Sequence, residues 1–132
     1  MKASAGGVEG QNVPRFLRRA LRFCIELLKK EKALGKRIGI LGAGQLGRML
    51  ALAGIPLDIQ FRFFDPAPDG PASQIADQIV APYDDQLALA RFAENCDAIT
   101  YEFENVPTET AEFLAKFAPV FPPPNALRAA QQ

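Results

Sequence analysis

A glycine-rich motif, GAGQLG at residues 42–47, has the composition of a ligand-binding turn. It follows the apolar run 37–41 and opens a stretch with helical periodicity. In such a unit the first glycine permits a tight turn, the second lets a ligand approach the backbone, and the third lets helix and strand pack closely. Backbone amides at the start of a helix favour an anion. The motif therefore predicts a ligand that carries phosphate, without specifying which one.

A single acid follows the next apolar run. Asp65 ends the predicted strand 59–64 and lies 18 residues after Gly47. An acid in this place holds ribose hydroxyls in dinucleotide-binding domains, so the NAD(P)-binding domain of an oxidoreductase is one interpretation. Because Pro66 favours extended or turn backbone at the residue before it, Asp65 also fits as the first residue of a plain turn.

Two glutamates occur at the carboxyl end of a later predicted strand, in the segment YEFENVP at residues 101–107. Residues at i and i+2 of an extended segment point the same way, so Glu102 and Glu104 could face one crevice, or one of them could turn into the following loop. Open α/β sheets bind ligands at this edge. The acids would suit hydroxyl or amino groups of a ligand. The alternative is a solvated acidic loop before the next helix, with Asn105 and Pro107 as turn residues.

The remaining pattern supplies the elements that would position these residues. Strands are predicted at 37–41, 59–64, 76–81, 98–101 and 119–121, and helices at 45–54, 84–96 and 109–117, the last with Thr108 as its N-cap. Strands separated by single helices indicate an α/β fold, a Rossmann-like doubly wound parallel sheet, because each crossover must return the chain to the same end.

The first 35 residues differ from the rest in charge. Residues 1–36 contain nine Lys/Arg and three Glu, although the whole chain has 15 basic and 15 acidic residues. Residues 14–34 have the pattern of a basic amphipathic helix, which Gly35 would end. Four interpretations of this helix remain open. It could dock on this domain or on a neighbouring subunit, lie on an anionic membrane surface, or act as a targeting leader, or the true start of the protein could lie further downstream. We therefore expect an extension at 1–35 and a domain at 36–132.

Composition excludes some chemistry. The chain has no histidine, and its two cysteines, Cys24 and Cys96, match no metal-ligand spacing. We expect reduced thiols, a cytoplasmic protein, no membrane span, no nucleic-acid partner, no metal site and no catalytic residue within this chain.

The motifs together resemble a known family. GAGQLGRM at 42–49, YEFENVP at 101–107 and PPPNALRAAQ at 122–131 are similar to the N-terminal, pre-ATP-grasp domain of 5-(carboxyamino)imidazole ribonucleotide synthase. DPAP at 65–68 and ASQIAD at 72–77 match the family pattern too, so the resemblance covers about residues 36–131. It departs at the basic extension and at Asp58, where the family more often has glycine.

The resemblance implies an ATP-grasp ligase of purine biosynthesis. Members use ATP and Mg²⁺ to activate bicarbonate as carboxyphosphate, and carboxylate the 5-amino group of 5-aminoimidazole ribonucleotide. The glycine turn, Gly44 with Gln45 and Leu46, would lie at the ribose phosphate. Glu104 would contact the sugar or base, with Glu102 and Asn105 as further substrate-binding candidates.

ATP and Mg²⁺ would bind to ATP-grasp domains that these 132 residues do not contain, so the chain alone is expected to be inactive. The full-length enzyme is expected to be a homodimer. Besides this ligase, an oxidoreductase cofactor domain and a non-catalytic binding module remain as alternative functions.

Overall fold

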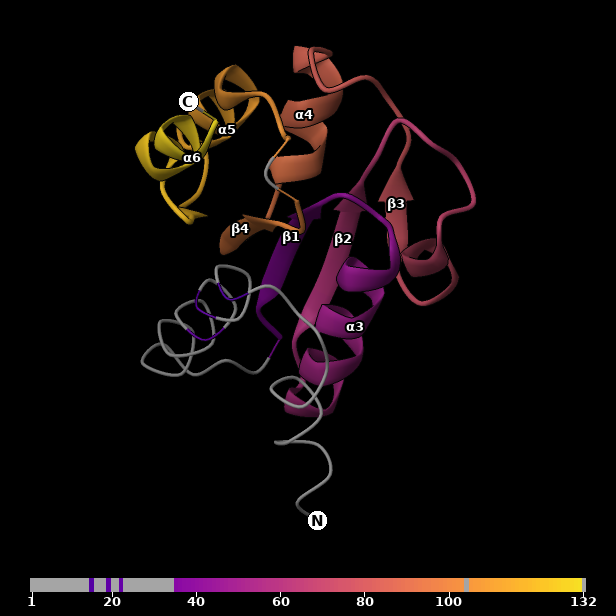
Figure 1. The fold of residues 1–132 in the computed structure, drawn as a ribbon. Helices are drawn as coiled ribbons and strands as arrows, with labels where there is room; N and C mark the ends of the chain where they lie inside the picture. Colours follow the sequence, from indigo (N-terminus) through magenta and orange to yellow (C-terminus); the bar gives the residue numbers. More distant parts are fainter. Residues whose placement is uncertain (1–14, 16–18, 20–21, 23–34, 104, 132) are drawn as a thin grey trace.

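The computed structural model describes Arg15, Arg19, Arg22 and residues 35–103 and 105–131. Its centre is a five-stranded parallel sheet in the order β3-β2-β1-β4-β5 (Figure 1). In chain order the elements are β1 (Arg37–Leu41), α3 (Gln45–Gly54), the 3₁₀ turn η1 (Ile55–Leu57), β2 (Gln60–Phe64), the 3₁₀ turn η2 (Pro71–Gln74), β3 (Asp77–Ile79), α4 (Gln86–Ala93), β4 (Ala98–Tyr101), α5 (Thr108–Leu114), β5 (Val120–Phe121) and α6 (Pro124–Ala130).

β1 occupies the middle of the sheet and pairs with strands on both sides. Its last residue, Leu41, lies in register with Phe64 at the end of β2 and with Tyr101 at the end of β4. From β1 the chain adds β2 and β3 on one side and later β4 and β5 on the other. The strand order therefore reverses at β1, and the segments that follow β1, β2 and β4 meet at one edge, where ligands of open α/β sheets bind.

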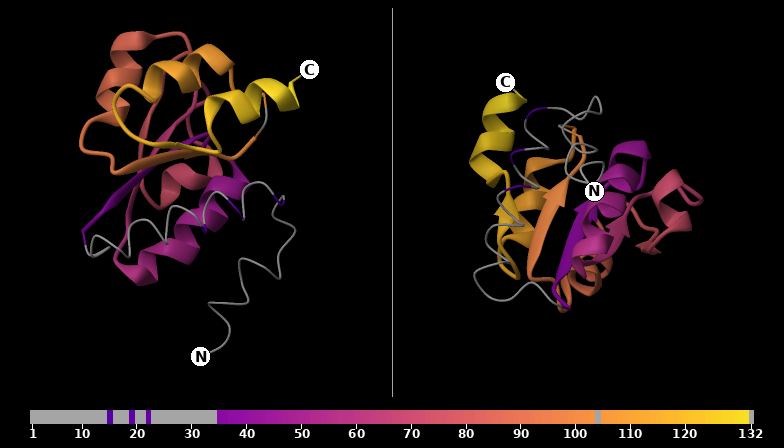
Figure 2. Two further views of the ribbon diagram at one scale, coloured as in Figure 1. Left: turned by 90° about the vertical axis from the view of Figure 1, so that its left-hand side faces the viewer. Right: turned by 90° about the horizontal axis from the view of Figure 1, so that it is seen from below.

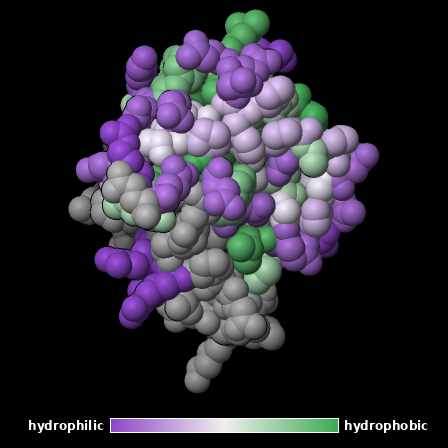
Figure 3. Space-filling model, turned by 45° about the horizontal axis from the view of Figure 1, so that its top comes forward, coloured by the Kyte–Doolittle hydropathy of each residue, from purple (hydrophilic) through white to green (hydrophobic). Residues whose placement is uncertain are grey.

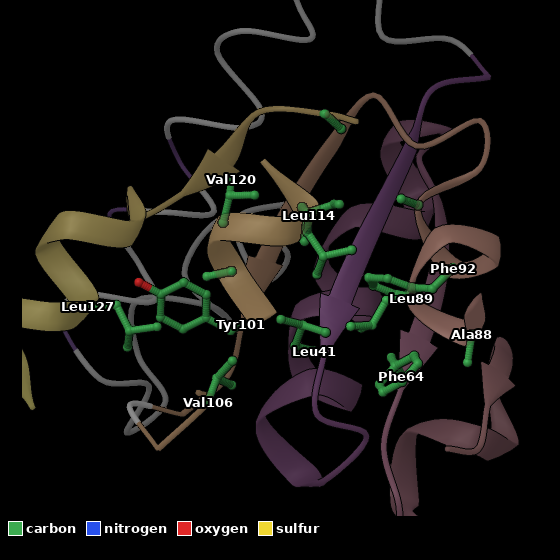
Figure 4. Close-up of a cluster of buried hydrophobic side chains, with 14 residues drawn as sticks. Leu41, Phe64, Ala88, Leu89, Phe92, Tyr101, Val106, Leu114, Val120 and Leu127 are labelled. Atoms are coloured by element: carbon green, nitrogen blue, oxygen red, sulfur yellow. The ribbon is translucent and has the colours of Figure 1, made fainter. Parts of the chain in front are cut away.

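Helices cover both faces of the sheet, as the doubly wound fold requires (Figures 1 and 2). On one face α3 and η2 pack over a cluster that includes Ile38, Ile40, Leu50, Phe61 and Phe63. On the other face α4 and α5 cover a second cluster (Figure 4), whose largest members are Leu41, Phe64, Leu89, Phe92, Ile99, Tyr101 and Leu114. Each such side chain contributes about 1.5–3 kcal/mol when fully buried. The predicted α/β class is confirmed.

Element boundaries differ from the sequence prediction mainly in length. The third strand is limited to Asp77–Ile79 and the following helix to Gln86–Ala93, while α6 was not predicted as a helix. Asp58 adopts the left-handed conformation, with φ of 62°. This agrees with the expectation that aspartate tolerates the conformation.

The prediction that Thr108 caps the next helix was wrong. α5 begins at Thr108 itself, and Pro107 takes the N-cap position, where its carbonyl accepts hydrogen bonds from the amides of Thr110 and Ala111. Proline fixes φ near the value that it has here, −57°, so the backbone turns into the helix one residue earlier. The Thr108 hydroxyl instead donates to Oε1 of Gln131, at 2.8 Å, at the end of α6.

The amphipathic helix predicted at 14–34 lies largely outside the described residues. Arg15, Arg19 and Arg22 are helical and exposed. Gly35, with φ of 76°, donates its amide to the carbonyl of Asp58 at 3.2 Å. Within the described part of the chain, no helix combines the length and the apolar character needed to cross a bilayer.

On the face shown in Figure 3, hydrophobic residues are dispersed among hydrophilic ones.

Candidate functional site

The glycine turn connects the end of β1 to the start of α3. Gly42 has φ of 101°, a left-handed conformation that side chains disfavour, and its amide donates to the carbonyl of Phe64 at 2.7 Å. Gly44 is the N-cap of α3, with extended backbone and no side-chain cap of its own. The turn thus has the strand–turn–helix geometry that the sequence predicts, and it presents the first amides of α3 to the edge of the sheet.

A glutamate from the neighbouring strand supplies the missing cap. The carboxylate of Glu102 accepts hydrogen bonds from the amide of Gly44, at 2.9 Å, and from the amide of Gly47. The Glu102 amide in turn donates to the carbonyl of Leu41, at 3.1 Å, which extends the β1–β4 pairing by one residue. Because β4 lies directly beside β1, the first residue after β4 reaches the turn that follows β1.

The three glycines of the motif all make room for this carboxylate. A Cβ atom on Gly42 would lie 2.4 Å from Cγ of Glu102, one on Gly44 would lie 2.8 Å from its Oε1, and one on Gly47 would lie 2.9 Å from its Oε2. A Cβ on Gly47 would also meet the Phe63 ring at 3.0 Å, so this glycine permits close helix–strand packing as well. The group that approaches the backbone at Gly44 is therefore a side chain of the protein itself.

A second carboxylate holds the other side of the turn. Oδ2 of Asp65 accepts from the amide of Ala43 and Oδ1 accepts from the amide of Ala67, both at 2.8 Å. The carbonyl of Ala43 accepts from the amide of Ala72 at 3.0 Å and leaves no space for a side chain at Gly70. Asp65 therefore joins the turn after β1 to the loop after β2.

Burial makes the charge at this site costly. Glu102 is only 9% exposed, and burial raises the pKa of its carboxyl group; the hydrogen bonds from Gly44 and Gly47 oppose that rise, and the charge of Asp65 adds to it. Tyr83, in the loop before α4, has its pKa raised by burial first and then by the charges of Asp65 and Glu102. The site is thus electronegative, with carboxylate oxygens on both sides of the turn.

Two amides in the first turn of α3 remain for a ligand. Among the described residues, the backbone N–H groups of Gln45 and Leu46 donate to no protein acceptor, while those of Ala43, Gly44 and Gly47 are engaged. The side chain of Gln45 is exposed and that of Leu46 is half-buried. The helix dipole adds a partial positive charge at these amides.

The predicted residues Gly44, Gln45, Leu46 and Glu102 lie together at the carboxyl ends of β1 and β4. Asn105 is exposed in the turn before α5, and Glu104 lies outside the described residues. Whether these residues contact substrate stays a prediction.

Sequence reasoning missed Tyr83 and Gln131. The Tyr83 ring packs 5.6 Å from Phe64 and 6.0 Å from Phe103, and the Tyr83 carbonyl accepts from the Thr110 hydroxyl. Gln131 donates from Nε2 to the carbonyl of Val106 at 2.7 Å, and so ties α6 to the loop after β4. The only sequence signal for Gln131 was its place in the motif at 122–131; Tyr83 gave none.

The geometry disfavours the dinucleotide interpretation. In dinucleotide-binding domains the pyrophosphate lies on the amides around the second glycine, and the strand-end acid binds ribose. Here a carboxylate occupies the amides of Gly44 and Gly47, and Asp65 is engaged by Ala43 and Ala67. Among residues 35–103 and 105–131, no group of three or more acids and cysteines is arranged to hold a metal ion.

The fold and the site define a Rossmann-like domain whose glycine turn is braced by acids from both neighbouring strands. Residues 35–131 match the model of the ribonucleotide synthetase preATP-grasp domain. The chain therefore belongs to that family.

Individual relatives agree with this assignment. The chain is 52% identical over 95 residues to N5-carboxyaminoimidazole ribonucleotide synthase of Pseudomonas aeruginosa, covering 72% of this chain and 26% of that protein. The Thermus thermophilus N5-carboxyaminoimidazole ribonucleotide synthetase structure superimposes with a TM-score of 0.69 at 55% identity, covering 71% of this chain and 26% of that one.

An Aspergillus clavatus N5-carboxyaminoimidazole synthase, solved with ADP and 5-aminoimidazole ribonucleotide, gives a TM-score of 0.65 at 34% identity, covering 73% of this chain and 26% of that one. The chain thus spans about a quarter of the length of the relatives it matches.

Proposed function

We propose that this chain is the ribonucleotide-binding part of an ATP-dependent carbon–nitrogen ligase of purine biosynthesis. The reaction joins bicarbonate to the 5-amino group of 5-aminoimidazole ribonucleotide and converts ATP to ADP and phosphate. The observation that carries the proposal is the acid-braced glycine turn at the switch point of a preATP-grasp domain. The Aspergillus clavatus relative, solved with 5-aminoimidazole ribonucleotide and ADP, supports the choice of substrate.

The contacts divide the roles among the residues of the turn. The amides of Gln45 and Leu46 donate to an oxygen of the ribonucleotide, and Gly44 leaves the space in which the carboxylate of Glu102 caps the turn beside them. A sugar oxygen fits this place better than the dianionic phosphate that the sequence alone favoured, because the carboxylate of Glu102 lies on the adjacent amides of Gly44 and Gly47. Glu102 holds the turn, while Glu104 and Asn105 accept from hydroxyl or amino groups of the sugar or base.

The other components of the reaction belong to the whole enzyme. ATP supplies the phosphoryl group that activates bicarbonate, and Mg²⁺ accompanies it, on domains that are absent from these 132 residues. The proposal also includes a cytoplasmic homodimer. Relatives solved with ADP or ATP support the nucleotide. Mg²⁺, the cytoplasmic location and the homodimer rest on the family resemblance alone.

Calorimetric titration of the purified chain tests the proposal. We expect saturable binding of 5-aminoimidazole ribonucleotide and no binding of NADH. Glu104→Gln should weaken ribonucleotide binding at least about tenfold, or about 1.4 kcal/mol. The matched control, Glu109→Gln, removes the same charge from an exposed position in α5 and should leave affinity unchanged. Binding of NADH, or failure of the wild-type chain to bind the ribonucleotide, would overturn the proposal.

A further inference from the structure

The glycine turn of this protein is already filled at the place where such turns usually bind phosphate. The amides of Gly44 and Gly47, which point toward the edge of the sheet, both donate to the carboxylate of Glu102. The amide of Ala43 donates to Asp65. Three of the five amides from Ala43 to Gly47 therefore have a partner that carries the same sign of charge as a phosphate.

Space and charge both exclude an external anion from this place. The positions of a Cβ on Gly42, Gly44 and Gly47 each lie within 3 Å of a Glu102 atom, so the carboxylate takes up the volume that the glycines leave open. A phosphate beside it would meet a like charge. Two like charges this close repel more strongly beside a protein surface than they would in bulk water, because the surroundings screen them less.

The carboxylate is also held firmly in this position. Glu102 is nine-tenths buried and is anchored through its own amide to the carbonyl of Leu41. Its carboxylate lies at the positive end of the α3 dipole, which offsets part of the cost of burying a charge there. A phosphate can reach the amides of Gly44 and Gly47 only after these hydrogen bonds break.

We propose that Glu102 is a specificity determinant, a built-in carboxylate that occupies the phosphate place of the glycine turn and excludes phosphate and pyrophosphate ligands from it. Glu102 thereby leaves only the amides of Gln45 and Leu46 in the turn for a ligand. It does so without touching the bound ligand. This inference goes beyond the proposed function and does not depend on it, since it concerns which ligands cannot bind to the turn.

The test follows the amide signals of Gly44 and Gly47 by ¹⁵N NMR while inorganic pyrophosphate is added to the 132-residue chain. In the wild type we expect neither signal to move with pyrophosphate concentration. In Glu102→Ala the freed amides should bind pyrophosphate, with both signals shifting to saturation and an affinity at least about tenfold above the wild type, or about 1.4 kcal/mol. Glu109→Ala, which removes an exposed acid, should behave as the wild type.

Two results would overturn the inference. One is saturable movement of the wild-type Gly44 and Gly47 signals with pyrophosphate, which would show that Glu102 does not exclude it. The other is a folded Glu102→Ala variant in which these signals stay still. Glu102→Ser, with a small hydroxyl in place of the carboxylate, serves if the alanine variant does not fold. The wild-type titration remains a test even if neither variant folds. Movement of the Gly44 and Gly47 signals with pyrophosphate would contradict its exclusion from the turn, and signals that stay still would agree with it.

Discussion

At the scale of single residues, Glu102 combines a cost with a benefit. Removing a carboxylate from water is unfavourable, but each hydrogen bond to a charged acceptor returns about 1.5–3 kcal/mol. The amides of Gly44 and Gly47 would otherwise be among the unpartnered donors at the start of α3. The burial of this acid is therefore explained by the cap that it provides to a helix from another part of the chain.

This balance makes stability depend on pH in a specific direction. Burial raises the pKa of Glu102 in the folded protein above the ordinary value of 4.5. At pH values between the ordinary pKa and the raised one, the folded state therefore binds a proton more readily than the unfolded state. The stabilisation linked to this proton is complete below the ordinary pKa and is lost as pH rises through the raised one. The wild type should therefore gain stability relative to Glu102→Gln, which cannot ionise, as pH falls through that window.

Urea denaturation of both proteins across this pH range measures the effect as the difference between their free energies of unfolding. Glu109→Gln, at an exposed acid, controls for the general loss of one carboxyl group. A wild-type advantage that shrinks with falling pH would contradict the assignment of the raised pKa to Glu102.

The residue pattern predicted part of this arrangement. The glycines at 42, 44 and 47 and the two glutamates at 102 and 104 placed a turn and an acidic strand end at the same edge of the sheet. The contact between them could not be derived, because it requires β4 to lie beside β1. The order of the strands depends on how helices pack on both faces of the sheet, and neither motif contains residues that indicate it.

At the scale of elements, boundaries depend on contacts that periodicity does not contain. The helix predicted at 84–96 begins only after Asp85, whose side chain accepts from the amide of Ala88 at 3.0 Å. At the other end the guanidinium of Arg62, on β2, donates to the carbonyls of Arg91, Phe92 and Glu94. Caps from the helix's own sequence can be anticipated, but a cap from a neighbouring strand cannot.

The N-cap of α4 gives a prediction with an adjacent control. Asp85→Ala removes the hydrogen bond to Ala88 and should lower the free energy of unfolding by about 1 kcal/mol. Asp84→Ala removes the same charge from the exposed neighbouring position and should change stability by only about 0.5 kcal/mol or less. Chemical denaturation of the two variants compares them directly, and equal losses would show that the cap contributes nothing of its own.

At the scale of the whole molecule, the strands of the sheet that the structure describes all follow Gly35. The described members of both clusters run from Ile38 to Leu127. The shift in charge at about residue 35 predicts a domain boundary there, which stays a prediction, and the matched family model covers residues 35–131. What the extension does was not predictable, because an amphipathic pattern does not identify the surface that it covers.

Removal of residues 1–34 should therefore leave the domain folded. We expect the melting temperature of the shortened chain to lie within about 4 °C of the full chain, which corresponds to a change of 1 kcal/mol or less for a domain of this size. Differential scanning calorimetry of both chains makes the comparison. A larger fall, or loss of the cooperative transition, would mean that the extension completes the core.

The central claim is that a ribonucleotide binds at the carboxyl ends of β1 and β4, and amide mapping by ¹⁵N NMR tests it most directly. Titration of the chain with 5-aminoimidazole ribonucleotide should shift the amide signals of Gln45, Leu46 and Asn105 to saturation, because the first two belong to the glycine turn and Asn105 lies in the segment that follows β4. Signals of the exposed η1 residues Ile55 and Leu57, at the far end of α3, should not move. Shifts confined to other surfaces, or the same three signals responding to NADH, would contradict the account.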